Sequence, residues 1–266
     1  MREVSVGIIT GSGTYALPGL REAASSTVET RFGSVQVTSG LWDGAEIVHV
    51  SRHGEGHARL SSHVNHRANV LALRELGVEA VIAATICGAV DPALELGGLV
   101  VFDDLHFLAN RLPDGSICSL YEEPGQAGRG HWVYEQPFSE PVRRALLEGA
   151  AAAGLPVRDG GCYGHVDGPR FNTRAEIRML AGCGVSAVSQ TAGPETVLCG
   201  EAELPYALLG YVTDYANGVS LRATPVSELA RLVAASSDAL AGSLHAAAQQ
   251  LTGPPPPPVG VHLRFD

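Results

Sequence analysis

Hydrophobic residues gather in short, continuous runs rich in β-branched side chains, a pattern typical of strands that are covered on both faces. Runs of this kind occupy residues 4–10, 45–51, 79–85, 99–104, 185–190 and 206–214. Segments with helical spacing lie between or after them, at about residues 62–76, 140–153 and 226–251, and in "TRAEIRMLAGCG" and "GPETVLCGEAE". Strands that alternate with helices predict an α/β sandwich built on a mostly parallel or mixed sheet.

The composition changes near the end of the chain, at a run of five prolines from Pro254 to Pro258. Because proline cannot continue a helix, the last predicted helix ends before this run, which forms a stiff, extended spacer. We therefore expect one domain over residues 1–253 and a Pro-rich tail over residues 254–266. Residues 109–130 are rich in turn formers and long for a loop, which favours either a lid or a subunit contact.

Composition and charge narrow the choice of partner. A formal net charge of -10 argues against a broad nucleic-acid surface, so we expect a small-molecule ligand. Five cysteines without a CxxC pair indicate reduced thiols rather than a zinc site. The opening residues, "MREVSVGIITGSG", lack the apolar core of a signal peptide and a membrane span, so we expect a cytoplasmic protein without a membrane partner.

Candidate chemistry follows three of the predicted strands, in "TGSGTY", "SRHGEGH" and "TICGAVDP". The carboxyl ends of strands in an open α/β sheet face the ligand crevice, so Ser12, Arg52 and Thr85 are expected to converge there. Glycine-lined amides, a hydroxyl, a guanidinium and the His53 imidazole all suit an anion. Taken singly, an ordinary turn explains the first stretch better, and a surface arginine with a satisfied histidine explains the second equally well. Their convergence is the stronger signal.

Several motifs occur together in a fixed order: "GIITGSG", "SRHGEGH", "HVNHRANVLALRELGV", "TICGAV", "DGPRFNTRAEIRML", "QTAGPE" and "VTDYANG". Over about residues 4–220 this order and spacing resembles the trimeric purine nucleoside phosphorylase family, and its methylthioadenosine phosphorylase branch most closely. The resemblance implies a single-domain α/β sandwich whose central mixed, partly barrel-like sheet is flanked by helices. It also implies phosphorolysis of a purine nucleoside with inorganic phosphate as co-substrate, no metal or organic cofactor, and a homotrimer or a dimer of trimers.

The resemblance implies roles for particular residues, position by position. It implies phosphate-binding groups at Ser12, Arg52, His53, Thr85, the amide of Ile86, and Thr191. It implies purine-binding residues at Cys87, Gly88, Phe171, Asn172 and Asp214, and a ribose contact at Gln190. The substituent on the 5' carbon is expected to lie near Val226, Leu229 and the His131 that a neighbouring subunit lends. Glu195 is expected to support a neighbouring loop.

Asp214 carries the catalytic role in this interpretation. A buried, protonated carboxyl can donate to purine N7, so that the base leaves as a neutral species. Without the family resemblance, a strand-end cap explains Asp214 better, a core position is the default for Phe171, and ordinary solvation explains His131.

The base preference rests on two positions. Enzymes of this family that act on 6-oxopurines place a glutamate where this chain has Asn172 and an asparagine where it has Asp214. The Asp214 carboxylate can accept a hydrogen bond from the amino group of adenine. A 6-aminopurine is therefore favoured, although the second aspartate usual in the methylthioadenosine branch is replaced by Ala216 and Asn217. A phosphorylase for inosine, guanosine or 5'-methylthioinosine is the alternative.

Gln190 departs from the family pattern, which has methionine under the ribose at this position. A glutamine can hydrogen-bond sugar hydroxyls where methionine supplies only apolar contact, which predicts an altered sugar or weakened activity. A degenerate protein that binds a nucleoside without turnover is therefore a second alternative. A hydrolase is a weaker one, because anion donors serve no purpose when water is the nucleophile.

Overall fold

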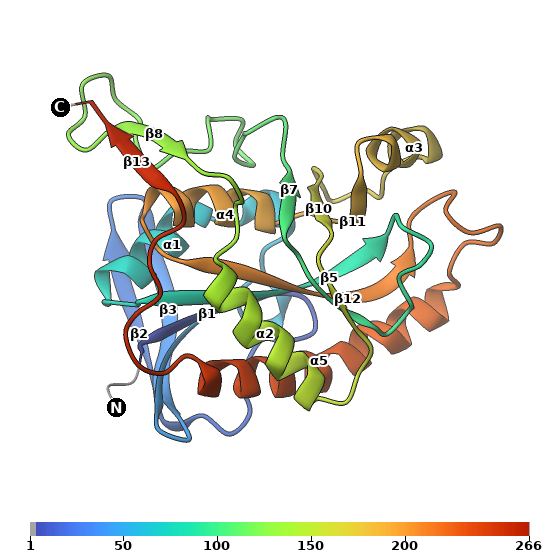
Figure 1. Ribbon diagram of the computed structural model, residues 1–266, viewed down its shortest axis with the longest axis horizontal. Coiled ribbons are helices and arrows are strands. Elements are labelled where there is room, and N and C mark those ends of the chain that lie inside the picture. The colour runs from blue at the N-terminus through green and yellow to red at the C-terminus, as the bar shows by residue number, and fades with distance from the viewer. Residues whose placement is uncertain (1–3, 266) are drawn as a thin grey trace.

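The computed structural model describes residues 4–265, apart from the side chain of Glu55, as one α/β unit around a large mixed sheet (Figure 1). Eleven strands of the described chain run in the order β2-β3-β4-β1-β5-β11-β10-β7, with β12, β6 and β9 branching from β5. The strands of the sheet are β1 (Val6–Thr10), β2 (Arg21–Thr30), β3 (Gly33–Trp42), β4 (Ala45–Ser51), β5 (Ala80–Ala89), β6 (Leu99–Val101), β7 (Asp104–His106), β9 (Val157–Asp159), β10 (Cys162–His165), β11 (Val185–Ser189) and β12 (Tyr206–Tyr215). This agrees with the predicted α/β class.

Helices cover the sheet on both faces. The helices are α1 (His66–Glu75), α2 (Glu140–Ala152), α3 (Arg174–Gly182), α4 (Ala192–Glu201) and α5 (Val226–Gln250). Alternate side chains of β5 explain the two layers. Ile82 belongs to the hydrophobic core formed with α2 and α5, and Val81 belongs to the core on the other face, formed with α1 and α4. Because a strand points successive side chains to opposite faces, its continuous apolar run serves both cores.

Strand β5 is longer than the sequence predicted, and this corrects one expectation. The apolar run was expected to end near Thr85 and to give way to a loop, but the strand continues through "TICGA" to Ala89. The continuation has a partner, because β12 pairs alongside it in parallel as far as Tyr215 opposite Ala89. Small residues in this stretch therefore belong to a strand rather than to a turn.

The other edge of β5 is open for part of its length. Strand β1 pairs with residues 80–83 of β5, and β11 pairs with Gly88 and Ala89. Residues 84–87 therefore pair with β12 alone. Because β1 ends its pairing before Ala84 and β11 begins its pairing only at Gly88, the sheet has a gap beside residues 84–87, and the candidate site lies there.

Other boundaries differ from the prediction for local reasons. The helix expected from residue 62 begins at His66, after a short 3-10 turn, because the Asn65 side chain accepts from the Ala68 amide and caps it. The run at residues 99–104 splits into β6 and β7. The hairpin of β2 and β3 was not predicted, since β2 is exposed along most of its length and carries no apolar run.

The Pro-rich tail returns to the domain. After the prolines, β13 (Val261–Arg264) pairs antiparallel with β8 (Gly130–Val133), as Figure 1 shows. The Trp132 indole donates to the Val259 carbonyl at 2.8 Å, which holds the two segments together. Residues 109–130 are likewise anchored, because Arg67 of α1 donates to two of their carbonyls and Glu201 of α4 accepts from the Leu120 amide. Within the described chain, none of the helices has both the length and the apolar character that a membrane span needs.

Candidate active site

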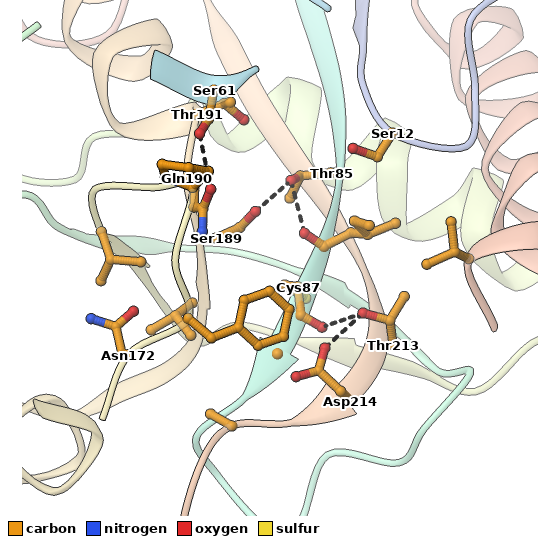
Figure 2. Close-up of a pocket in the computed structure, with 18 of the residues that line it drawn as sticks. Ser12, Ser61, Thr85, Cys87, Asn172, Ser189, Gln190, Thr191, Thr213 and Asp214 are labelled. Atoms are coloured by element: carbon orange, nitrogen blue, oxygen red, sulfur yellow. Dashed lines mark hydrogen bonds between the residues drawn. The ribbon is translucent and has the colours of Figure 1, made fainter. Parts of the chain in front are cut away.

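A cavity of about 300 Å³ opens where β1, β4, β5, β11 and β12 end or diverge (Figure 2). It brings together all but two of the residues that the sequence analysis expected to contact a ligand: Ser12, Arg52, His53, Thr85, Ile86, Cys87, Gly88, Phe171, Asn172, Gln190, Thr191, Asp214 and Leu229. These residues lie up to 217 positions apart in the chain, so only the fold makes them neighbours. Convergence at the strand ends is what the sequence predicted.

Arg52 lies at the buried end of the cavity and is 1% exposed. Its Nε and Nη2 donate to the two carboxylate oxygens of Glu195 at 2.6 and 2.9 Å, and its Nη1 donates to the Ala84 carbonyl at 2.7 Å. Burial lowers the pKa of the guanidinium, but the adjacent carboxylate outweighs it and raises the pKa above its ordinary value. Glu195 therefore supports Arg52 itself, and the group stays charged.

Backbone approach to Arg52 explains one glycine of the first motif. A Cβ added at Gly11 would collide with Nη1 of Arg52. Gly13 has φ +87, in the left-handed region that favours glycine. The "GSG" turn is thus shaped to bring the Ser12 loop down onto the guanidinium.

His53 follows Arg52 and is fixed by a backbone contact. Its Nδ1 lies 2.9 Å from the Arg59 carbonyl, which can only accept, so this nitrogen carries the hydrogen. Burial, followed by the charge of Arg52, lowers the pKa of the imidazole to about 4. The ring is therefore neutral near pH 7.

Hydroxyl groups gather opposite these two residues. Thr85 Oγ1 lies 3.1 Å from Ser189 Oγ, which the sequence analysis missed, and 3.0 Å from the Ile86 carbonyl. Thr191 precedes helix α4, and its own hydroxyl makes no capping bond. A helix N-terminus favours a negative ligand, so Thr191 is well placed as an anion donor, and the Thr85 hydroxyl lines the same cavity.

Asp214 lies at the other end of the open stretch of β5. It is 9% exposed, pairs in register with Gly88, and accepts a hydrogen bond from the Thr213 hydroxyl at 2.9 Å. Burial raises the pKa of its carboxyl above the ordinary value, and the Thr213 bond only partly opposes this. A side chain at position 88 would press on Asp214, since an added Cβ lies 3.0 Å from Oδ2.

Figure 2 shows Asp214 and Thr213 in the lower part of the pocket, with Thr85 and Ser12 above them. Gly88 lies three positions beyond Thr85 on β5, which amounts to about 10 Å at the rise of an extended strand. This separation leaves room for a sugar ring between a bound anion and a base. The cavity therefore has an anion end and an acid end.

The rim of the cavity carries aromatic and amide groups. Phe171 is 61% exposed, so a flat ligand would cover its ring. The Asn217 side chain, which also lines the cavity, donates to the Asn172 carbonyl at 2.8 Å. These groups place apolar and amide surface where a base would enter.

Gln190 has a structural task. Its Oε1 accepts from the Ser61 hydroxyl at 2.9 Å, and its Nε2 donates to the Arg170 carbonyl at 3.1 Å. It therefore ties the loop that carries Phe171 to the segment before α1. One amide hydrogen remains for a sugar hydroxyl.

Two of the expected ligand contacts, Val226 and His131, lie outside this cavity. Val226, at the first turn of α5, is 80% exposed, while Leu229 and Val233 of the same helix line the cavity. His131 lies on β8, opposite Leu263 of β13, and its ring contacts Phe265 edge-on. Because its expected role is in a neighbouring subunit, that role stays a prediction.

Among the residues that line this cavity, Cys87 is the one that carries a thiol. Burial, followed by the charge of Asp214, raises the pKa of the Cys87 thiol well above its ordinary value, so Cys87 packs rather than reacts. All five cysteines of the sequence are free thiols. Among residues 4–265, no three His, Cys, Asp or Glu side chains gather closely enough to hold a metal ion.

Comparison with known proteins shows the family to which the chain belongs. Residues 5–247 match the model of the phosphorylase superfamily. The chain is 37% identical over 238 residues to a probable 6-oxopurine nucleoside phosphorylase of Thermococcus kodakarensis, covering 88% of this chain and 87% of the relative. It is 34% identical over 215 residues to an S-methyl-5'-thioadenosine phosphorylase of Geobacter sulfurreducens, covering 80% and 73%.

A solved structure has the same fold. The methylthioadenosine phosphorylase of Schistosoma mansoni, in complex with adenine, superposes with a TM-score of 0.84 at 28% identity, covering 93% of this chain and 91% of the other. The resemblance found in the sequence motifs is confirmed. This chain belongs to the phosphorylase superfamily.

Proposed function

We propose that this protein is a purine nucleoside phosphorylase that acts on 5'-methylthioadenosine or another 5'-substituted 5'-deoxyadenosine. An oxygen of inorganic phosphate forms a bond to the anomeric carbon while the bond from that carbon to purine N9 breaks, with inversion. The products are free adenine and a pentose 1-phosphate. The observation that carries this proposal is a single cavity that Arg52, His53 and several hydroxyls line together with Asp214, where Gly88, the partner of Asp214, lies about 10 Å along β5 from Thr85.

The anion end fixes the nucleophile. Holding phosphate in line beneath the sugar turns a bimolecular encounter into a positioned one, and the buried location keeps water away. Thr85, Thr191 and Ser12 supply hydroxyl donors, and Arg52 supplies its remaining N–H.

The acid end neutralises the leaving group. The electron pair of the broken bond passes to the purine, and the protonated carboxyl of Asp214 gives its proton to N7. The base leaves neutral, and the carboxylate that remains regains a proton before the next turnover. Desolvation of Asp214 supports this role because it favours the protonated form.

The choice of base follows from Asp214 and Asn172. Once one carboxyl oxygen faces N7, the other can accept from the amino group of adenine, and position 172 offers no acid for the N1–H of a 6-oxopurine. The alternative is a 6-oxopurine substrate, favoured by the relatives with that name and by the amide of Asn217, which can donate to a carbonyl oxygen.

The rest of the proposal concerns the 5' group and the assembly. Leu229 and Val233 form an apolar wall that suits a methylthio group, and in a homotrimer, or a dimer of trimers, His131 of a neighbouring subunit would complete it. We further propose that the enzyme needs no metal or organic cofactor and works in the cytoplasm.

The test is a substrate panel with and without phosphate. Purified protein is incubated with 5'-methylthioadenosine, adenosine, inosine and guanosine, and the released base is quantified by chromatography. Adenine released from 5'-methylthioadenosine only when phosphate is present supports the proposal, and faster release of hypoxanthine favours the alternative. Tight nucleoside binding without base release would instead identify a non-catalytic binder, and release without phosphate would identify a hydrolase.

A further inference from the structure

Arg52 has few hydrogen-bond donors left for an anion, and its charge is already balanced by Glu195. Of its five N–H donors, Glu195 accepts two, the Ala84 carbonyl accepts one, and the Ile9 carbonyl accepts a fourth at 3.5 Å. One Nη1–H remains without a partner among the described residues. Because the Glu195 carboxylate balances the guanidinium, the protein contributes almost no net positive charge to this end of the cavity.

His53 presents a lone pair where an anion would bind. Since Nδ1 carries the hydrogen that the Arg59 carbonyl accepts, the neutral ring has its lone pair at Nε2. Within the described residues Nε2 has no hydrogen-bond partner, and the adjacent Cδ2 faces Gly11 of the Ser12 loop. A lone pair in this place repels a divalent anion unless it gains a proton.

His57 also lines this part of the cavity, and the sequence analysis gave it no role. Its ring stacks on that of His53 with 4.3 Å between centroids and 17° between planes. Its Nδ1 lies 3.0 Å from the hydroxyl of Tyr15, which follows the Ser12 loop. With Tyr15 as donor, His57 carries its own hydrogen on Nε2. His57 has φ 59 in the turn Glu55–His57, so the backbone is shaped to hold this ring over His53.

Resting on the proposed phosphate site, we infer that His53 takes up one proton from solution when a divalent anion binds, while the Nε2–H of His57 donates to the same anion. The negative charge of the ligand favours the imidazolium at Nε2 of His53. The proton forms an N–H bond at Nε2 and no other bond changes.

The surrounding groups do not already supply the negative charge that this step needs. The titratable groups near the pair are Tyr15 after β1, Arg52 after β4, His66 on α1 and Glu195 on α4. His66 is fully buried, and burial followed by His165 and Arg52 keeps its pKa well below the ordinary value. Glu195 is engaged by Arg52. The ligand itself is therefore the charge that sets the protonation of His53.

Sulfate is a suitable probe because it stays divalent across the neutral range, so any proton taken up on binding comes to rest on the protein. Titration calorimetry at pH 7 in two buffers of different ionisation enthalpy gives the number of protons absorbed. We expect about one proton per bound sulfate, and an affinity that falls about tenfold per unit of rising pH between 6 and 7. Binding without proton uptake, or no binding of sulfate at all, overturns the inference.

Two variants separate the roles of the rings. His53→Gln keeps a donor near the Nε2 position but cannot titrate, so its sulfate binding should absorb no proton and be flat with pH. His57→Phe keeps a flat stacked ring but lacks the donor, so binding should weaken about tenfold or more while proton uptake persists. If His57→Phe binds sulfate with wild-type affinity, His57 does not donate to the anion. Asp214→Asn is the control that should leave proton uptake unchanged, because Asp214 lies at the far end of the cavity.

The outcome is independent of turnover. Proton-linked sulfate binding in a protein that cleaves no nucleoside would refute the proposed function and leave this inference standing. Phosphorolysis accompanied by sulfate binding without proton uptake would refute this inference alone.

Discussion

The buried pair of Arg52 and Glu195 allows a sharp test of what supports the anion end. Replacing Glu195→Gln keeps the size of the side chain and removes its charge. Three donors converge on this carboxylate, from Nε and Nη2 of Arg52 and from the Tyr206 hydroxyl at 3.2 Å. An amide offers an NH2 group where one carboxylate oxygen accepted, so at least one pair of donors would face each other.

The magnitude follows from burial. The two side chains are 1% and 0% exposed, so the variant leaves a guanidinium in the interior without its counter-charge. Breaking one partner of a buried pair costs about 3–5 kcal/mol, which is a large part of the 5–15 kcal/mol that separates typical folded and unfolded states. At the same time Arg52 is no longer neutralised, so we expect sulfate to bind more tightly to Glu195→Gln than to the wild type.

Urea denaturation followed by circular dichroism, at one fixed protein concentration, measures the loss of unfolding free energy. Glu228→Gln is the matched control, because Glu228 makes an exposed ion pair with Arg231 and its loss should barely change stability. The double variant Arg52→Met/Glu195→Leu should recover much of the stability and lose anion binding. A loss below about 1 kcal/mol for Glu195→Gln would refute this account of the pair.

Three further outcomes are expected. Asp214→Asn should lower kcat/KM for 5'-methylthioadenosine by about 10²–10⁴-fold, and release of hypoxanthine from inosine should fall less. Burial raises the pKa of Asp214, so wild-type activity should persist below the raised pKa and decline as pH rises through it, whereas Asp214→Asn should lack this decline; an unchanged pH profile would contradict the assignment. Gln190→Met should free the loop at Arg170, seen as faster limited trypsinolysis and a raised KM for nucleoside, and equal cleavage rates would argue against the tie. The buried rings of His49 and His165 have pKa values lowered to about 4 and about 3, chiefly by burial, so the unfolded chain binds more protons below about pH 6.5. Stability should therefore be full above that pH and fall on acidification toward pH 4, and urea midpoints at pH 7.5 and 5 that coincide would refute this.

Several features of the site were predictable from short stretches of sequence. Arg52 and Thr85 follow or interrupt apolar runs, so their place near strand ends could be inferred from the alternation of hydrophobic and polar segments. His57 was visible in "SRHGEGH", yet no local pattern shows that its ring stacks on His53. Ser189 and Thr213 could not be identified locally either, because what marks each of them is its hydrogen bond to a distant or neighbouring site residue, Thr85 and Asp214 respectively.

The sequence by itself determined the α/β class, most strands and helices, the family, and most of the polar residues that line the cavity. Only the tertiary structure decided that β5 extends to Ala89, that Glu195 forms a buried ion pair with Arg52, and that Gln190 hydrogen-bonds the loop at Arg170. The physical reason is the distance along the chain over which each kind of interaction acts. Hydrophobic periodicity reports the environment of each segment from its own neighbours, whereas strand pairing and buried charge pairs join residues as far apart as 52 and 195, whose meeting depends on how every layer packs.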